Sequence, residues 1–344
     1  MKDGVYYSDY LQLDKILGAQ NLESDKEGQT HAHDEMLFIV IHQSYELWFK
    51  QVLYEVGSVI DIMSQPNIHD NSPDLFVANH RLKRVVTILQ VLIAKINILE
   101  TMTPLDFLDF RNMLRPASGF QSIQFKLLEA YLGLRMENRY GKEYYVSALK
   151  PEDAEIIKQA EHKKALITLV NEWLERMPFF DKKEFWPDAD TSAAIHPFWK
   201  KYDEIYSESL VTGEKFNFTR FEEVMLGTEK KAEWNLSPKA RRAALFIMMY
   251  RDYPLLQLPF QLINVLLEID ENLSTWRYRH MHMVHRMIGT RTGTGGSTGK
   301  DYLKGALDRH YIFAEFAELT SFMIERHRLP VLSSALRMRL GFEG

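Results

Sequence analysis

Three segments of the chain carry residues that could do chemistry, and the first is built around a histidine. His42 lies in a run of apolar residues, four positions after Phe38, so both side chains would share one face of a helix. Burying an imidazole in such a helix costs free energy unless its nitrogens find partners. Two interpretations stay open: a core histidine bonded to a backbone carbonyl, or a functional group in a pocket.

Two further histidines precede that run. His31 and His33, followed by Asp34, have a spacing that could suggest a metal site. No β-scaffold is expected there to present them, so we favour a cluster at a helix entry. Asp34 would act as the cap or as an acid of the first turn.

The second segment, residues 103–125, contains an arginine in aromatic surroundings. Arg111 follows Phe107 by four positions on a short helix. An arginine on a half-buried aromatic face is unusual unless it meets an anion, and its guanidinium can hold a carboxylate through two parallel hydrogen bonds. The alternative is a structural ion pair with Asp106 or Asp109.

The third segment, residues 276–300, holds three histidines. On a helix, His280 and His282 would point about 200° apart, so they cannot share one metal ion. His282 and His285 could share a face, but this stretch is rich in arginine, which favours a solvated basic surface. A single histidine as axial ligand fits a haem better than this set fits a mononuclear histidine cluster.

A glycine-rich stretch at 293–300 follows these histidines and resembles a phosphate-binding loop only superficially. Asp301 stands where that motif needs Ser or Thr, Thr298 replaces the third glycine of a dinucleotide fingerprint, and a helix precedes the stretch where a strand is required. The glycines and hydroxyls instead favour a loop that can close over a polar ligand.

Composition narrows the classes of protein and site. The chain has 344 residues, is 46% hydrophobic and 26% charged, and carries a net charge of −5. That balance is ordinary for a globular protein and argues against nucleic acid or an anionic membrane as partner. The absence of cysteine excludes disulfides, iron–sulfur clusters and thiolate-ligated haem.

The same features predict a cytoplasmic protein. The first residues lack the apolar core of a secretory signal. The longest apolar run, residues 243–250, is far shorter than the roughly 20 residues that span a bilayer.

Apolar spacing predicts helices nearly throughout and no strands, hence an all-α fold. A four-heptad pattern covers residues 75–99 and indicates packing along another helix, with Asp74 near the start. The stretch 33–56 is apolar on most faces, which predicts a buried central helix. Pro254 and Pro259 are expected to interrupt the C-terminal helical region. Further helices are predicted at 6–17, 105–115, 119–133, 152–177, 198–209, 217–227, 238–252, 258–289, 300–324 and 330–340.

The predicted domain organisation rests on a change in amino-acid composition along the chain. Residues 178–237 are polar and contain several prolines, so we predict a smaller helical insertion there. It would divide a large helical bundle into a first half, residues 1–177, and a second half, residues 238–344.

Taken together, these blocks resemble one family, the tryptophan 2,3-dioxygenases. The similar stretches are, in order, YYSDYLQLD, HDEMLFIVIHQSYELWFK, LETMTPLDF with the SGFQS that follows an F-x-x-F-R, and WRYRHMHMVHRMIG with GTGGSTG. The resemblance spans most of the chain and is closest over residues 5–135 and 240–310.

The resemblance implies a helical bundle that encloses a b-type haem, active in its Fe²⁺ form. Such an enzyme cleaves the indole C2–C3 bond of L-tryptophan with O₂ and yields N-formyl-L-kynurenine, the first step of the kynurenine pathway. By resemblance, His280 is the axial iron ligand and His42 the distal histidine. Phe38 packs on the indole, Arg111 holds the substrate carboxylate, and Thr294 bonds the amino-acid head group.

The family pattern implies further contacts. Ser118 would contact substrate and Gly119 the cofactor. Phe107 stands where certain bacterial enzymes carry a tyrosine that helps bind the carboxylate, so that one hydrogen bond is not expected here. The enzyme would be a homotetramer in which an N-terminal arm from a neighbouring subunit walls the pocket with Tyr7, Tyr10 and Leu11.

Two other interpretations remain. One is a related haem enzyme that oxygenates a different indole or inserts a single oxygen atom. The other is a non-catalytic helical scaffold, for which the heptad helix at 75–99 would be suited. The joint presence of His42, Arg111 and His280 favours the enzyme.

Overall fold

The fold is built from helices in every part of the chain that the structure describes. This computed structural model contains no strand in those ranges, which confirms the all-α prediction. The described residues are 4–66, 68, 72–134, 149–187, 189–193, 195–227, 231, 233–291 and 310–341.

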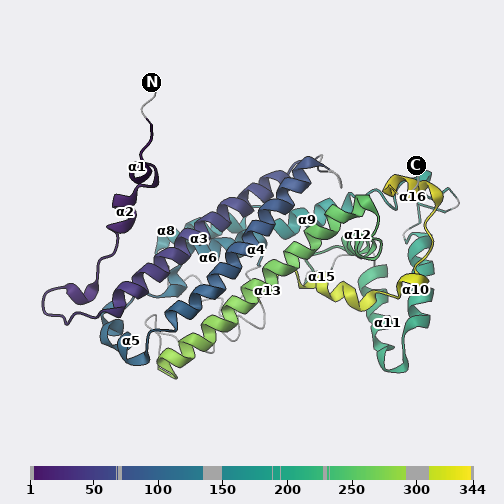
Figure 1. Cartoon of the computed structure of the whole chain (residues 1–344). Coiled ribbons are helices and arrows are strands. Elements are labelled where there is room, and N and C mark those ends of the chain that lie inside the picture. Colours follow the sequence, from purple (N-terminus) through teal and green to yellow (C-terminus); the bar gives the residue numbers. More distant parts are fainter. Residues whose placement is uncertain are drawn as a thin grey trace.

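Three long helices, α3 (Asp34–Met63), α4 (Pro73–Leu99) and α13 (Pro254–Ile288), run side by side (Figure 1). α4 begins where predicted, because the Ser72 side chain accepts a hydrogen bond from the Leu75 N–H and proline occupies the first turn. The predicted heptad seam is buried throughout and packs α4 against both neighbours: Leu75, Ala78, Leu82, Val85, Leu89, Leu92, Ile96 and Leu99.

The helix predicted for 33–56 exists as α3, but the expectation that it is buried nearly all round is wrong for the single chain. One stripe remains open to solvent, because Val40, Leu47 and Tyr54 are 45%, 54% and 76% exposed. These residues recur every seven positions, so they form a continuous apolar line along the outer face of α3.

The two prolines of the C-terminal region behave differently from each other. Pro254 opens α13 at its first position, where a missing N–H costs nothing, and it separates this helix from α12 (Pro238–Met249). Pro259 lies inside α13 without ending it, so the prediction that it interrupts the helical region is wrong. Its packing into the core keeps the helix continuous although one backbone hydrogen bond is lost.

The remaining predicted helices appear with shifted ends. The stretch 152–177 divides into α8 (Pro151–Glu161) and α9 (Leu166–Glu175), and 105–115 becomes α5 (Pro104–Arg111) with a 3₁₀ turn. Of the helix predicted at 300–324, the described part holds only α15 (Ala314–Glu318) and a following 3₁₀ turn. The others are α1 (Tyr7–Leu11), α2 (Leu13–Leu17), α6 (Ile123–Leu132), α10 (Pro197–Ser209), α11 (Phe216–Phe221) with a π turn after it, and α16 (Ser334–Leu340).

The segment predicted as an insertion shares its core with α12 and the C-terminal region. Phe180 and Phe198 contact Phe246 of α12, and the Tyr202 hydroxyl donates to the backbone oxygen of Phe322 at 2.7 Å. Its boundaries at 178 and 237 stay a prediction.

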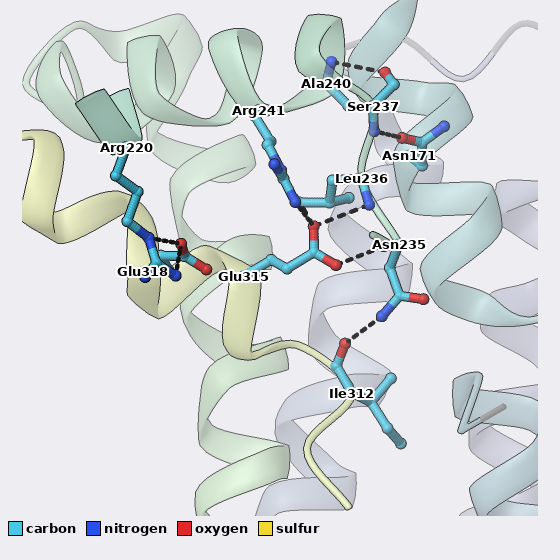
Figure 2. A network of polar contacts seen from close by, with 10 residues as sticks. All are labelled: Asn171, Arg220, Asn235, Leu236, Ser237, Ala240, Arg241, Ile312, Glu315 and Glu318. Carbon is cyan, nitrogen blue, oxygen red and sulfur yellow. Dashed lines mark hydrogen bonds and ion pairs between the residues drawn. The ribbon is translucent and has the colours of Figure 1, made fainter. Parts of the chain in front are cut away.

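A polar network ties α12, α15 and α9 together (Figure 2). Glu315 of α15 accepts hydrogen bonds from Arg241 of α12 at 2.6 Å and from the backbone N–H of Leu236 at 3.1 Å. The Asn171 side chain of α9 accepts from the backbone N–H of Ser237 at 2.7 Å. These bonds place the start of α15 against the bundle.

Within the described ranges, no single helix is both long enough and apolar enough to cross a membrane. The pair Pro73–Leu99 and Pro104–Leu114, bent by 92°, meets both conditions only when taken together.

Candidate functional site

A cavity of about 280 Å³ lies among α3, α5, α6 and α13, close to the C-terminal end of α4. Its wall is mainly aromatic and aliphatic, with a few polar groups, which is the usual character of a small-molecule site. Seven of the residues singled out from the sequence line it: Phe38, His42, Phe107, Arg111, Ser118, Gly119 and His280.

His42 enters the cavity from α3 with a defined orientation. Its Nδ1 lies 2.7 Å from the Phe38 carbonyl oxygen, so the neutral ring donates there and Nε2 carries the lone pair. The Phe38 ring lies 4.0 Å from the imidazole, centroid to centroid. Burial lowers the pKa of His42, although the bond to Phe38 and the charge of Glu46 oppose that shift. His42 therefore bonds a backbone carbonyl, as the first interpretation predicts, and it also faces a pocket, which the second requires.

His280 enters from α13. Its Nδ1 is buried and has no hydrogen-bond partner within the described residues. Burial, assisted by the proximity of His42, lowers the pKa of His280 to about 4, so the ring is uncharged near neutral pH. The indole of Trp276 stacks on it at 5.2 Å with an interplanar angle of 4°. An uncharged imidazole in an aromatic wall is a suitable ligand for haem iron.

Arg111 ends α5, whose first turn is fixed by a capping box between Thr103 and Asp106. Asp106 accepts from the N–H of the N-cap residue Thr103 at 2.8 Å, so this acid completes the capping box. The Arg111 side chain is only 4% exposed, and burial lowers its pKa, with the positive charges of Arg115 and Arg291 acting in the same direction. A buried guanidinium with positive neighbours favours an anionic ligand.

The aromatic floor next to Arg111 comes from α3 and α5. Phe38 stacks on Phe107 at 5.7 Å and meets Phe110 edge-on at 5.6 Å. Such a surface can hold a flat aromatic ring by offset or edge-to-face contact. Ser118 also faces the cavity, while its hydroxyl oxygen accepts from the Phe120 N–H at 3.3 Å as a helix cap.

Other predicted site residues do not join the cavity within one chain. Tyr7 and Tyr10 are each 75% exposed on α1, and Figure 1 shows this N-terminal arm standing off from the three long helices. Leu11 on the same helix does not line the cavity either. Thr294 and the glycine-rich stretch lie outside the described residues.

The sequence predicted that His282 and His285 lie on a solvated surface and do not bind a metal ion. His282 and His285 are exposed on the outer face of α13. Asp34 is an acid of the first turn of α3, as predicted. Across the described ranges, no group of three or more His, Asp or Glu side chains could hold a metal ion.

Sequence reasoning missed a polar group in the cavity wall. Lys126 and Glu129 of α6, Arg277 of α13 and His310 are all buried and line the cavity. The signal was present in α6, because two charged residues interrupt the apolar sequence IQFKLLEAYL on one face.

The chain is similar to proteins of one family over nearly its whole length. The family model described as tryptophan 2,3-dioxygenase matches residues 1–323. A protein of that name from Alteromonas mediterranea is 43% identical, covering 98% of this chain and 97% of its own. Its namesake from Bdellovibrio bacteriovorus is 40% identical over 98% of both chains. The Dictyostelium discoideum protein of the same name is 40% identical over 98% of this chain and 88% of its own.

Proposed function

The chain belongs to the tryptophan 2,3-dioxygenase family of oxidoreductases, and from that premise we propose that it cleaves the indole C2–C3 bond of L-tryptophan with O₂ to give N-formyl-L-kynurenine. This is the first step of tryptophan catabolism by the kynurenine pathway. One observation carries the proposal: two uncharged imidazoles and a buried guanidinium line one aromatic cavity.

The cofactor of this proposal is haem b, and the residues present fit it. His280 would hold the iron, because its ring is uncharged and its Nδ1 has no partner among the described residues. Haem in its Fe²⁺ form would supply the iron chemistry that activates O₂. Gly119 would lie against the macrocycle, since a residue without a side chain permits close approach.

The chain's own contribution is to bind and orient the substrate. Arg111 would pair with the tryptophan carboxylate, a contact strengthened by its exclusion from water. Phe38 and Phe107 would hold the indole by ring contacts. Ser118 and Thr294 would bond the amino-acid head group.

His42 is the group placed to act on the indole N–H. Because its Nδ1–H donates to Phe38, its Nε2 carries the lone pair and can accept a proton or a hydrogen bond. The lowered pKa keeps this nitrogen unprotonated near neutral pH, as an acceptor must be.

The active form would be a homotetramer. The apolar stripe of Val40, Leu47 and Tyr54 on α3 is left exposed by the part of the chain that the structure describes, and Val91 and Ile98 of α4 are likewise 40% and 49% exposed. Exposed apolar residues at heptad spacing are suited to pack against another helix. The arm with Tyr7, Tyr10 and Leu11 would complete a neighbour's pocket. We further infer that the assembly acts in the cytoplasm.

The proposal is tested by measuring cofactor, binding and product on one preparation. A pyridine haemochrome assay should give one haem b per subunit. Anaerobic titration with L-tryptophan should then perturb the haem spectrum. Turnover with ¹⁸O₂ should yield N-formyl-L-kynurenine that contains two labelled oxygen atoms. A colourless protein would refute the haem assignment, and a product with one labelled atom, or turnover only of other indoles, would refute the reaction.

A further inference from the structure

Two arginines hold the turn of α13 that leads to His280. The Arg277 guanidinium donates to the Glu129 carboxylate of α6 at 2.8 Å and to the backbone oxygen of His310 at 3.1 Å. Arg279 donates to the Asn97 side chain at 2.8 Å and to Glu100 at 3.1 Å, both on the side of α4. Positions 277 and 279 point about 200° apart on a helix, so the turn is held from opposite sides.

The two contacts differ in burial. The Arg277 and Glu129 side chains are each 5% exposed, whereas those of Arg279 and Glu100 are 33% and 24% exposed. Taking two charges out of water is so costly that a buried ion pair contributes little net stability, while loss of one partner is strongly destabilising. The Arg277–Glu129 pair therefore contributes mainly orientation, because its hydrogen bond is directional and links α13 to α6.

Apart from the two arginines, the described residues of α13 that line the cavity near this turn are mainly apolar. Trp276, Met283 and Met287 face the cavity or the core with apolar surfaces. Hydrophobic contact is non-directional, so it buries this face of α13 without fixing how far the helix is rotated. The side chain that binds a metal ion, in contrast, must be held within roughly 0.5 Å and 10–20° of its ideal position and orientation.

We propose that the buried Glu129–Arg277 pair is the positioning device that sets the rotation of α13, and hence the direction of the His280 imidazole, toward a tetrapyrrole in the cavity. This inference rests on the proposed function. Glu129 and Arg277 act through the helix and not on the substrate. Arg279, on the opposite side and more exposed, gives secondary support.

The test uses haem-loaded protein with Glu129→Gln and, separately, Arg277→Met. Two properties are measured besides activity: the rate of haem transfer to excess apomyoglobin and the iron–histidine stretching frequency of the ferrous protein. We expect both variants to release haem at least about tenfold faster, equivalent to about 1.4 kcal/mol. Both should also shift the iron–histidine frequency in the same direction.

A matched control comes from a second arginine–glutamate pair that is largely buried. Arg241 and Glu315 are 2% and 15% exposed and lie in the network of Figure 2, away from the cavity lining. Glu315→Gln should lower the melting temperature as Glu129→Gln does, yet leave haem release and the iron–histidine frequency unchanged. Arg279→Gln should have a smaller effect on both than Arg277→Met.

The outcomes separate this inference from the function on which it rests. Wild-type protein that binds no haem, or does not oxidise tryptophan, defeats the proposed function. If the wild type passes and Glu129→Gln leaves release and frequency unchanged, the positioning role is wrong. A change in Arg277→Met alone would show direct contact with the cofactor and also overturn it. Should Arg277→Met fail to fold, the nearly isosteric Glu129→Gln still decides.

Discussion

Burial lowers the pKa values of individual residues in the cavity. His42 and His280 both lie where water is excluded, and both have lowered pKa values, chiefly because desolvation penalises the imidazolium form. Arg111 stays charged, because a guanidinium cannot be deprotonated near neutral pH even when burial lowers its pKa. The cavity thus contains two imidazoles whose pKa values are lowered and, in Arg111, a buried guanidinium that stays charged.

The first prediction concerns the proposed iron ligand. His280→Ala should reduce haem content to a small fraction of one per subunit, because the other histidines that line the cavity in the described ranges have partners of their own: His42 bonds Phe38 and His310 lies 3.4 Å from Glu129. Haem content is measured by pyridine haemochrome on protein whose circular dichroism matches the wild type. His282→Ala is the control, because it changes an exposed histidine that points about 200° away from His280 on the same helix, and this variant should retain full haem. A normal five-coordinate spectrum in His280→Ala would contradict the assignment.

The second prediction concerns the substrate carboxylate. Arg111→Ala should lower kcat/KM for L-tryptophan by the equivalent of about 2–5 kcal/mol, the range found when one partner of a buried charge pair is removed. Haem content should stay unchanged. Affinity for tryptamine, which lacks the carboxylate, should change little, and spectral titration measures it. Equal losses with both ligands would mean that Arg111 supports the pocket and does not bind the carboxylate.

Among the elements, α13 connects the cavity to the region before α15. Asp270, one of its buried residues, accepts the backbone N–H of Ile312 at 3.0 Å, while Arg277 bonds the backbone oxygen of His310. Both contacts lie on the inner face of the helix, seven residues apart, the repeat that keeps side chains on one face. The helix that carries His280 therefore also holds the backbone of residues 310–313 through hydrogen bonds.

The third prediction is a pH dependence at this connection. Burial raises the pKa of Asp270 from 3.8 to about 6, although the backbone N–H groups of Phe313 and Ile312 favour the charged form. The folded protein therefore keeps a proton that the unfolded chain releases, so this group's contribution to stability is full below about pH 4 and is lost as pH rises through about 6. Urea unfolding should show wild-type stability falling by roughly 2 kcal/mol relative to Asp270→Asn between pH 4 and 7. If the stability of the wild type and that of Asp270→Asn depend on pH in the same way, Asp270 does not titrate as predicted.

The fourth prediction tests the seam between the long helices. Leu89 is 2% exposed in the seam of α4, so Leu89→Ala should leave a cavity and lower the free energy of unfolding by about 2–5 kcal/mol. Val91→Ala on the same helix changes a residue that is 40% exposed and should cost well under 1 kcal/mol, roughly the surface range. Denaturant melts of the two variants measure the contrast. Similar losses at both positions would show that α4 does not depend on this seam.

For the whole molecule, the N-terminal arm is the feature that a single chain does not explain. α1 and α2 bury no residue, yet they carry exposed aromatic side chains at Tyr6, Tyr7 and Tyr10. Apolar surface of this kind is a mark of an interaction site. Exchange of arms between subunits would give those side chains a place to pack.

The fifth prediction follows from arm exchange. Removal of residues 1–17 should leave the melting temperature of the subunit nearly unchanged and abolish most activity. Mixing this truncated chain with full-length Arg111→Ala should restore part of the activity, because an intact arm would then enter a pocket with an intact arginine. Assay of purified hetero-oligomers measures the recovery. Two inactive parents that stay inactive together would argue against arms acting between subunits.

The sequence alone determined the helical class, the α4 seam and the main candidate residues, because these depend on local periodicity and residue chemistry. The heptads of 75–99 are buried as predicted, and Phe38, His42, Phe107, Arg111, Ser118 and His280 line one cavity. The family resemblance, drawn from the motifs, is confirmed by the family model and the relatives.

Tertiary structure decided what depends on contacts distant in the sequence. The pairing of Glu129 with Arg277 joins residues 148 positions apart, and no local pattern specifies such a partner. The stripe of α3 was predicted to be buried because an apolar sequence indicates that a face tends to be covered, but the sequence does not show whether a neighbouring helix covers it, and in the structure the stripe is exposed. Pro259 stayed within α13 because packing of the surrounding core outweighs the loss of one backbone hydrogen bond.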